Sequence, residues 1–170
     1  MLLHGSSKHP AETITLTPHL VVRFAARAID FYRRAFGAEE VLRLNGPDGE
    51  IVHAELRLGA ASLYLNEESP GDEARSPESL GGAPASLHLY VADVDHAFAR
   101  AVAAGAIPVT RVADMFWGDR YGTVRDPFGY EWALATRTEV LSPEEIRARA
   151  QRILTAAAAE APPARPAAGM

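Results

Sequence analysis

The stretch that decides the fold is residues 18–41, PHLVVRFAARAIDFYRRAFGAEEV. It predicts a short strand over 14–22, then a turn, a helix over about 27–36 and a new strand. The helix is expected to end at Gly37, because glycine adopts the left-handed conformation of a helix end with no steric penalty. A strand, a helix and a return strand therefore open the domain.

The same order of elements returns in residues 87–109, LHLYVADVDHAFARAVAAGAIPV, where the helix is expected to end at Gly105. His19 lies 18 positions before Gly37 and His88 lies 17 positions before Gly105, so the halves align with a single gap. Two unrelated strand–helix units could share this pattern by chance, but the order of the elements favours an internal repeat.

Each helix leads into strands joined by hairpin turns. The expected strands are 39–44, 50–57 and 61–66 in the first half, and 107–112, 120–125 and 130–136 in the second. The sequences GPDG (46–49) and DPFG (126–129) are typical of turns. The order is β-α-β-β-β twice, which predicts an α+β fold. Because one helix cannot cover both faces of such a sheet, the modules should form a concave, partly closed sheet around a groove suited to small molecules.

Changes in composition divide the chain. The expected division is a mobile tail over 1–12, a paired-module domain over 13–138 (first module 13–66, linker or lid 67–85, second module 86–138), a C-terminal helix over 139–160 and a disordered tail over 161–170. Residues 67–85 show no strand or helix period. The C-terminal helix is signalled by Ser142 as cap, Pro143 at the first helical position and Glu145 as the capping-box acid.

The composition excludes several classes of protein. With 48% hydrophobic and 23% charged residues, the chain is expected to be globular. No apolar stretch approaches the ~18 residues of a membrane helix, and no signal peptide is evident, so a cytoplasmic location and no membrane partner are expected. The lack of cysteine excludes disulfides, a thiol nucleophile and thiolate metal sites. A net charge of -5 argues against a nucleic-acid partner.

Three stretches, HLVV…AIDFYRRAFGAEEV, LHLYVADVDHAFARAVAAGA and VRDPFGYEWAL, resemble the glyoxalase/bleomycin-resistance/extradiol-dioxygenase superfamily, also called the vicinal oxygen chelate superfamily. The resemblance covers about residues 14–138 and is greatest to bacterial glyoxalase-like members. It implies paired β-α-β-β-β modules and commonly a homodimer.

The resemblance also implies where a metal would bind. Enzymes of this family hold one divalent metal with four side chains from the first and last strands of both modules. The family spacing puts these positions at Thr17, Leu63, Ser86 and Ala133. None of the four supplies the imidazole or carboxylate that such a metal needs, so no cofactor is expected.

A divalent metal would have to use displaced ligands. His19, His88 and Glu131 each lie two residues from one of the four positions, and a shift of two keeps a side chain on the same face of a strand. A metal, if present, is therefore expected on these three residues.

The same residues, with others, are candidates for binding an organic ligand. His53 and Glu55 share one face of a strand, which is also typical of a solvated or salt-bridged surface. The loop 114–122 (DMFWGDRYG) gathers aromatic rings and Arg120, which suit a planar or anionic ligand. Phe116 and Trp117 could instead be core or dimer contacts, with Arg120 paired to Asp119 or Asp126. The full ligand-binding set is His19, His53, His88, Tyr90, Trp117, Arg120 and Glu131.

The leading hypothesis is a metal-free binding protein for an antibiotic or metabolite. The alternative is a metal-dependent lyase, isomerase or thiol transferase that uses the displaced ligands. Metal-independent acid–base catalysis by the same histidines and Glu131, and a dimeric interaction module with a closed groove, stay open. Whether the protein is an enzyme is not decided by the sequence, which contains no phosphate loop, nucleophile elbow or His-Glu-x-x-His helix.

Overall fold

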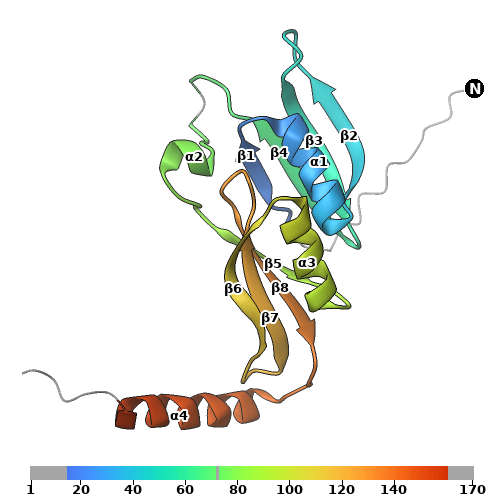
Figure 1. Ribbon diagram of the computed structural model, residues 1–170. Helices are drawn as coiled ribbons and strands as arrows, with labels where there is room; N and C mark the ends of the chain where they lie inside the picture. The colour runs from blue at the N-terminus through green and yellow to red at the C-terminus, as the bar shows by residue number, and fades with distance from the viewer. Residues whose placement is uncertain (1–14, 72, 161–170) are drawn as a thin grey trace, which may run out of the picture.

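Two four-stranded sheets, each with one helix between its first two strands, form the body of the protein (Figure 1). The computed structural model describes residues 15–71 and 73–160. The elements are β1 (His19–Val22), α1 (Ala25–Phe36), β2 (Glu39–Asn45), β3 (Ile51–Leu58), β4 (Ala61–Glu67), α2 (Pro77–Leu80), β5 (Ser86–Tyr90), α3 (Val94–Ala104), β6 (Ile107–Asp114), β7 (Asp119–Arg125), β8 (Glu131–Arg137) and α4 (Pro143–Glu160). The predicted α+β fold with two β-α-β-β-β modules and a C-terminal helix is confirmed.

Both sheets have the same topology. The strand orders are β1-β4-β3-β2 and β5-β8-β7-β6, and in each sheet the first and last strands of the module run parallel. The remaining neighbours are antiparallel hairpins. The first strand is shorter than the expected 14–22, and the expected tails 1–12 and 161–170 lie outside the described residues.

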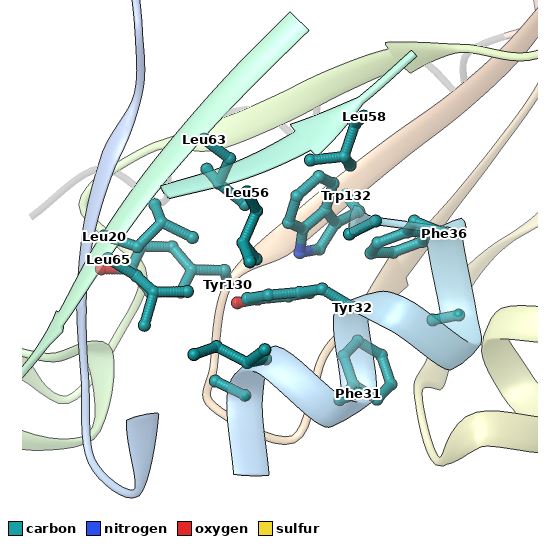
Figure 2. Packing of buried hydrophobic residues seen from close by; sticks show 14 of the residues in the cluster. Leu20, Phe31, Tyr32, Phe36, Leu56, Leu58, Leu63, Leu65, Tyr130 and Trp132 are labelled. Carbon is teal, nitrogen blue, oxygen red and sulfur yellow. The ribbon is translucent and has the colours of Figure 1, made fainter. Parts of the chain in front are cut away.

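The two modules share one hydrophobic core. Helix α1 packs against α3 and also places its aromatic side chains against the second module. The ring centres of Phe36 and Trp132 lie 4.5 Å apart, and those of Tyr32 and Trp132 lie 5.3 Å apart. Figure 2 shows Tyr32 and Phe36 facing Tyr130 and Trp132, with leucines of the first sheet completing the cluster.

Two tyrosines tie the modules together by hydrogen bonds. The Tyr32 hydroxyl donates to Asp126 Oδ2 at 2.8 Å. The Tyr130 hydroxyl donates to the Val21 carbonyl at 3.0 Å and accepts from the Val21 N–H at 3.2 Å. Because these groups are buried, the bonds fix how the modules meet.

The segment between the modules contains a short helix that its sequence pattern did not predict. Helix α2 begins after Ser76, whose Oγ accepts from the Ser79 N–H. The hydroxyls of Ser76 and Ser79 both donate to the Glu68 carboxylate, at 2.6 and 2.8 Å. A helix of four residues is too short to show a hydrophobic period, which explains why the pattern missed it.

The C-terminal helix starts as its sequence predicted. The Ser142 N–H donates to Glu145 at 2.8 Å, and the Glu145 N–H donates to Ser142 Oγ at 3.2 Å, which is a complete capping box. Arg149 folds back onto Glu139 with two contacts of 2.8 and 2.9 Å. From there α4 runs away from both modules (Figure 1). Among the described residues, no helix combines the length and apolar composition needed to cross a bilayer.

Candidate functional site

A cavity of about 560 Å³ lies between the two modules. Its walls come from β1 and β4 on one side and from β5 and β8 on the other, and are mainly apolar. His19 and His88 both line it, so the structure brings together the two histidines that occupy matching places in the repeat. The apolar lining includes Leu20, Leu63, Leu87, Leu89 and Trp132. A space of this size and character suits a small organic molecule.

A cluster of polar rings surrounds His19 in the first module. The ring centres of His19 and His53 are 5.9 Å apart, and those of His53 and Tyr64 are 5.1 Å apart. His53 Nε2 lies 3.3 Å from Glu55 Oε1. The His53–Glu55 pair predicted on one face of a strand is therefore observed beside His19.

The second module carries an aromatic wall, which we define as His88, Tyr90, Trp117 and Tyr121. Ring centres are 4.8 Å apart for His88 and Tyr90, 5.8 Å for His88 and Tyr121, and 5.7 Å for Trp117 and Tyr121. His88 belongs both to this wall and to the cavity. Strand alternation on β5 puts Tyr90 on the face of His88, as expected from the sequence.

A buried carboxylate holds the wall together. Asp119 is 1% exposed, and its Oδ2 accepts from the Tyr90 hydroxyl at 2.8 Å and from Trp117 Nε1 at 3.2 Å. Its Oδ1 accepts from Arg137 Nε at 3.2 Å. Arg137 also donates to the Tyr90 hydroxyl at 2.7 Å and lies over the Tyr90 ring. Hydrogen bonds to Asp119 and Tyr90 raise the pKa of Arg137, so the guanidinium stays charged.

Of the predicted set, only His19 and His88 line the cavity. His53 lies beside His19, Tyr90 and Trp117 belong to the aromatic wall, and the last two residues, Arg120 and Glu131, are held by ion pairs outside both groups. Arg120 contacts Asp95 at 2.6 Å and Asp114 at 3.1 Å, and these ion pairs raise its pKa. Glu131 lies 2.7 Å from Arg125 and lines a separate cavity beside α2 and the 126–129 turn. Neither residue lines the cavity that contains His19 and His88.

The strand register locates the four positions of the metal site that the resemblance implies. His19 lies opposite Tyr64, and His88 lies opposite Ala133, so the counterpart of Ala133 is Tyr64 and not Leu63. Leu63 is 2% exposed and belongs to the core. The spacing from the turn glycine was therefore one residue off in the first module.

The revised positions do not fit a divalent metal. Thr17, Tyr64, Ser86 and Ala133 offer neither imidazole nor carboxylate, and alanine has no donor at all. Within residues 15–71 and 73–160, no group of three or more His, Asp or Glu side chains is arranged to hold a metal ion. Of the displaced set, Glu131 is engaged by Arg125.

Sequence reasoning missed three polar residues near the wall and the core. Asp119 was considered only as a partner of Arg120, and Arg137 was not considered. Asp126 was assigned to a turn and considered as a partner of Arg120, yet it is 2% exposed and accepts four hydrogen bonds, from Tyr32, Trp132 and the N–H groups of Phe128 and Tyr130. Burial raises the pKa of Asp126, although these hydrogen bonds oppose the shift. The alternation of Asp119 with Tyr121 along one strand was the available signal.

One family model covers most of the chain. The model of the Glyoxalase/Bleomycin resistance protein/Dioxygenase superfamily matches residues 11–134. An uncharacterised protein of Mycobacterium tuberculosis (strain H37Rv) is 49% identical over 136 residues, which are 78% of this chain and 80% of the relative.

Solved structures show the same fold. TioX from Micromonospora sp. ML1 is 29% identical with a TM-score of 0.57, over 74% of this chain and 99% of TioX. The product of an Arabidopsis thaliana gene is 29% identical with a TM-score of 0.61, over 73% of this chain and 99% of that structure.

Proposed function

The chain belongs to the Glyoxalase/Bleomycin resistance protein/Dioxygenase superfamily, and we propose that it binds a small organic molecule, such as an antibiotic or a metabolite, without a metal. The observation that carries this proposal is the cavity of about 560 Å³, whose apolar walls present His19 and His88 from matching strands. Apolar walls bind the body of a ligand, and the imidazoles orient it by donating or accepting hydrogen bonds.

The chemistry of the donor positions supports binding without a metal. Thr17, Tyr64, Ser86 and Ala133 cannot replace imidazole and carboxylate ligands. A metal on His19 and His88 would also need Glu131, whose carboxylate is held by Arg125. Nothing in the proposal requires a cofactor.

The proposal includes a cytoplasmic homodimer. Strands β2 and β6 each form one of the two edges of their sheet, and their residues are almost all exposed. Each carries large apolar side chains that a second copy would cover: Val41, Leu42, Leu44, Ile107 and Val109. Light scattering after size-exclusion chromatography measures the mass, and a monomer at all concentrations would contradict this part of the proposal.

A block in the cavity tests the main proposal. The probe is N-phenyl-1-naphthylamine, an uncharged dye that fluoresces in apolar sites. The Ala85→Trp substitution adds bulk at the cavity wall, and Ala99→Trp adds the same bulk to an exposed position on α3. We expect dye binding to be lost in Ala85→Trp and retained in Ala99→Trp. Equal binding by both variants would show that the dye does not use the cavity.

The histidines provide a second test. His88→Ala should weaken the binding of any hydrogen-bonding ligand found in a metabolite screen, whereas His96→Ala, an exposed histidine on α3, should not. The screen is run with and without added Zn²⁺ and Mn²⁺. Binding that appears only with one of these ions, and disappears with a chelator, would contradict the metal-free proposal.

A further inference from the structure

The aromatic wall has the features of a ligand-binding surface in its own right. Its four rings, His88, Tyr90, Trp117 and Tyr121, lie within 6 Å of their neighbours and come from β5, β7 and the turn before β7. Tyr90 is 52% exposed, so part of this surface faces solvent. Exposed rings placed side by side favour stacking with a flat aromatic molecule.

The rings are held in position before any ligand arrives. Asp119 accepts from both Tyr90 and Trp117, and Tyr121 packs edge-on against Trp117. Because Asp119 is 1% exposed, its hydrogen bonds are shielded from competition by water. A wall fixed in this way loses little side-chain freedom on binding, which favours affinity.

The positive charge of Arg137 favours a ligand that carries a negative charge. The Arg137 guanidinium lies 5.0 Å from the centre of the Tyr90 ring. Its Nε and Nη2 bind Asp119 and Tyr90, and its Nη1 has no hydrogen-bond partner among the described residues. The Asp119 carboxylate is already compensated by three donors. A cationic ligand would therefore be repelled by Arg137, whereas a ligand carboxylate can accept a charge-assisted hydrogen bond from it.

We propose that the aromatic wall is the subsite for a planar aromatic acid, whose ring stacks on the wall and whose carboxylate binds Arg137. Asp119 is the positioning residue, because it acts on the ligand only through Tyr90, Trp117 and Arg137. This inference rests on the proposed function as a small-molecule-binding protein and names the class of ligand.

The two tryptophans allow the wall and the cavity to be observed separately. Trp117 Nε1 donates to Asp119 in the wall, and Trp132 Nε1 donates to Asp126 beside the cavity. In protein labelled with ¹⁵N at the indoles, Trp117→Phe assigns the two N–H signals. Titration with 2-naphthoate should move the Trp117 signal more than the Trp132 signal. The neutral analogue 2-naphthalenemethanol should bind several-fold to about tenfold more weakly, because it lacks the charge-assisted hydrogen bond.

Variants separate the roles of the residues. Arg137→Met should remove the preference for 2-naphthoate over the alcohol while leaving alcohol binding in place, and Arg147→Met, on exposed α4, should leave the preference unchanged. Tyr121→Leu should weaken both ligands by up to about tenfold. Asp119→Asn should broaden or shift the Trp117 signal and weaken both ligands, with the Trp132 signal in place to show that the fold is intact.

The outcomes distinguish this inference from the proposed function. Movement of the Trp132 signal alone, or tighter binding of a naphthyl trimethylammonium ion than of 2-naphthoate, would overturn the wall as an acid subsite and leave cavity binding standing. Movement of the Trp117 signal in a protein that does not bind the dye would support the wall and contradict the cavity. A preference that survives in Arg137→Met would overturn the role of Arg137.

Discussion

The two modules have the same topology but begin their helices differently. Asp93 caps α3 locally, since its side chain accepts from the His96 N–H at 3.0 Å. Helix α1 has Phe24 at its N-cap position, where φ of 62° is left-handed and the side chain makes no capping hydrogen bond. Its first N–H groups instead donate to Glu67 at the end of β4, at 2.6 and 2.7 Å. The start of α3 is therefore stabilised by an adjacent residue, whereas the start of α1 depends on Glu67, which lies 43 positions from Phe24.

The modules also differ in where they bury negative charge. Among the described residues, the buried aspartates Asp119 and Asp126 both belong to the second module. The first module contributes Tyr32 to Asp126 and presents polar rings around His19. The second module therefore supplies the acceptors that organise both the core and the aromatic wall, and the first module docks onto one of them.

The largest effect should come from the carboxylate that joins the modules. Asp126→Ala leaves the Tyr32 hydroxyl, the Trp132 indole and two N–H groups without an acceptor, and should lower the free energy of unfolding by about 4 kcal/mol. Asp119→Ala should lower it by about 1–2 kcal/mol, because Tyr90 and Arg137 can reach water. Urea denaturation measures both. If Asp126→Ala does not fold, Tyr32→Phe tests the same contact between the modules, with an expected loss of about 1 kcal/mol. Equal losses of stability in Asp126→Ala and Asp119→Ala would contradict the larger structural role of Asp126.

Removing the caps of α1 and α3 should change the free energy of unfolding by smaller amounts. Glu67→Ala removes the acceptor of two N–H groups at a left-handed residue, and should lower the free energy of unfolding by about 2 kcal/mol. Asp93→Ala should lower it by about 1 kcal/mol, as for an ordinary cap. Thermal and urea unfolding of both variants provide the comparison. A smaller loss for Glu67→Ala than for Asp93→Ala would show that the distant cap is dispensable.

Substitution by asparagine should have different effects on stability at the N-cap positions of α1 and α3. Phe24→Asn should raise the free energy of unfolding by up to about 1 kcal/mol, because asparagine tolerates the left-handed conformation better than a bulky residue. Asp93→Asn should change it by only a few tenths of a kcal/mol, because asparagine is also a good cap. A loss of stability in Phe24→Asn would indicate that the contact between the Phe24 ring and Arg27 outweighs the backbone strain.

The smallest effect should be the pH dependence of Asp126. Because its pKa is raised in the folded protein, the stability that it contributes is full below the unfolded pKa and is lost as the pH rises through the folded pKa. Exposed carboxyls such as Glu139, whose pKa Arg149 lowers, contribute in the opposite direction and lose stability as the pH falls. The indole N–H signal of Trp132 isolates Asp126, and its midpoint should lie above the ordinary range of an aspartate. A midpoint below that range would contradict the assignment.

The sequence was sufficient to predict the order of elements because each signal is local. Gly37 and Gly105 end their helices in the left-handed conformation, and the Ser142–Glu145 capping box starts the last helix. The docking of the modules could not be predicted, because Tyr32 and Asp126 are 94 positions apart and periodicity carries no information about which faces meet. The capping of α1 by Glu67 could not be predicted either, because Glu67 and Phe24 are also far apart in the sequence.

The candidate site was predictable only in part. Matching positions in the repeat pointed to His19 and His88, and both line one cavity. For Arg120 the sequence left open a pairing with an aspartate, but its partners Asp95 and Asp114 depend on how α3 and β6 pack beside β7. The pairing of Glu131 with Arg125 likewise depends on the register of β7 and β8. The linkage of Trp117 to Tyr90 through Asp119 depends on burial, which spacing alone does not report.

The final helix begins with its own capping box and is oriented by Arg149 on Glu139, after the last strand has ended at Arg137. The ladders of both sheets are therefore complete before α4 starts. We expect the segment from Ser142 onward to be exchangeable, so that a reporter or tether fused there would leave the two modules and the space between them as they are.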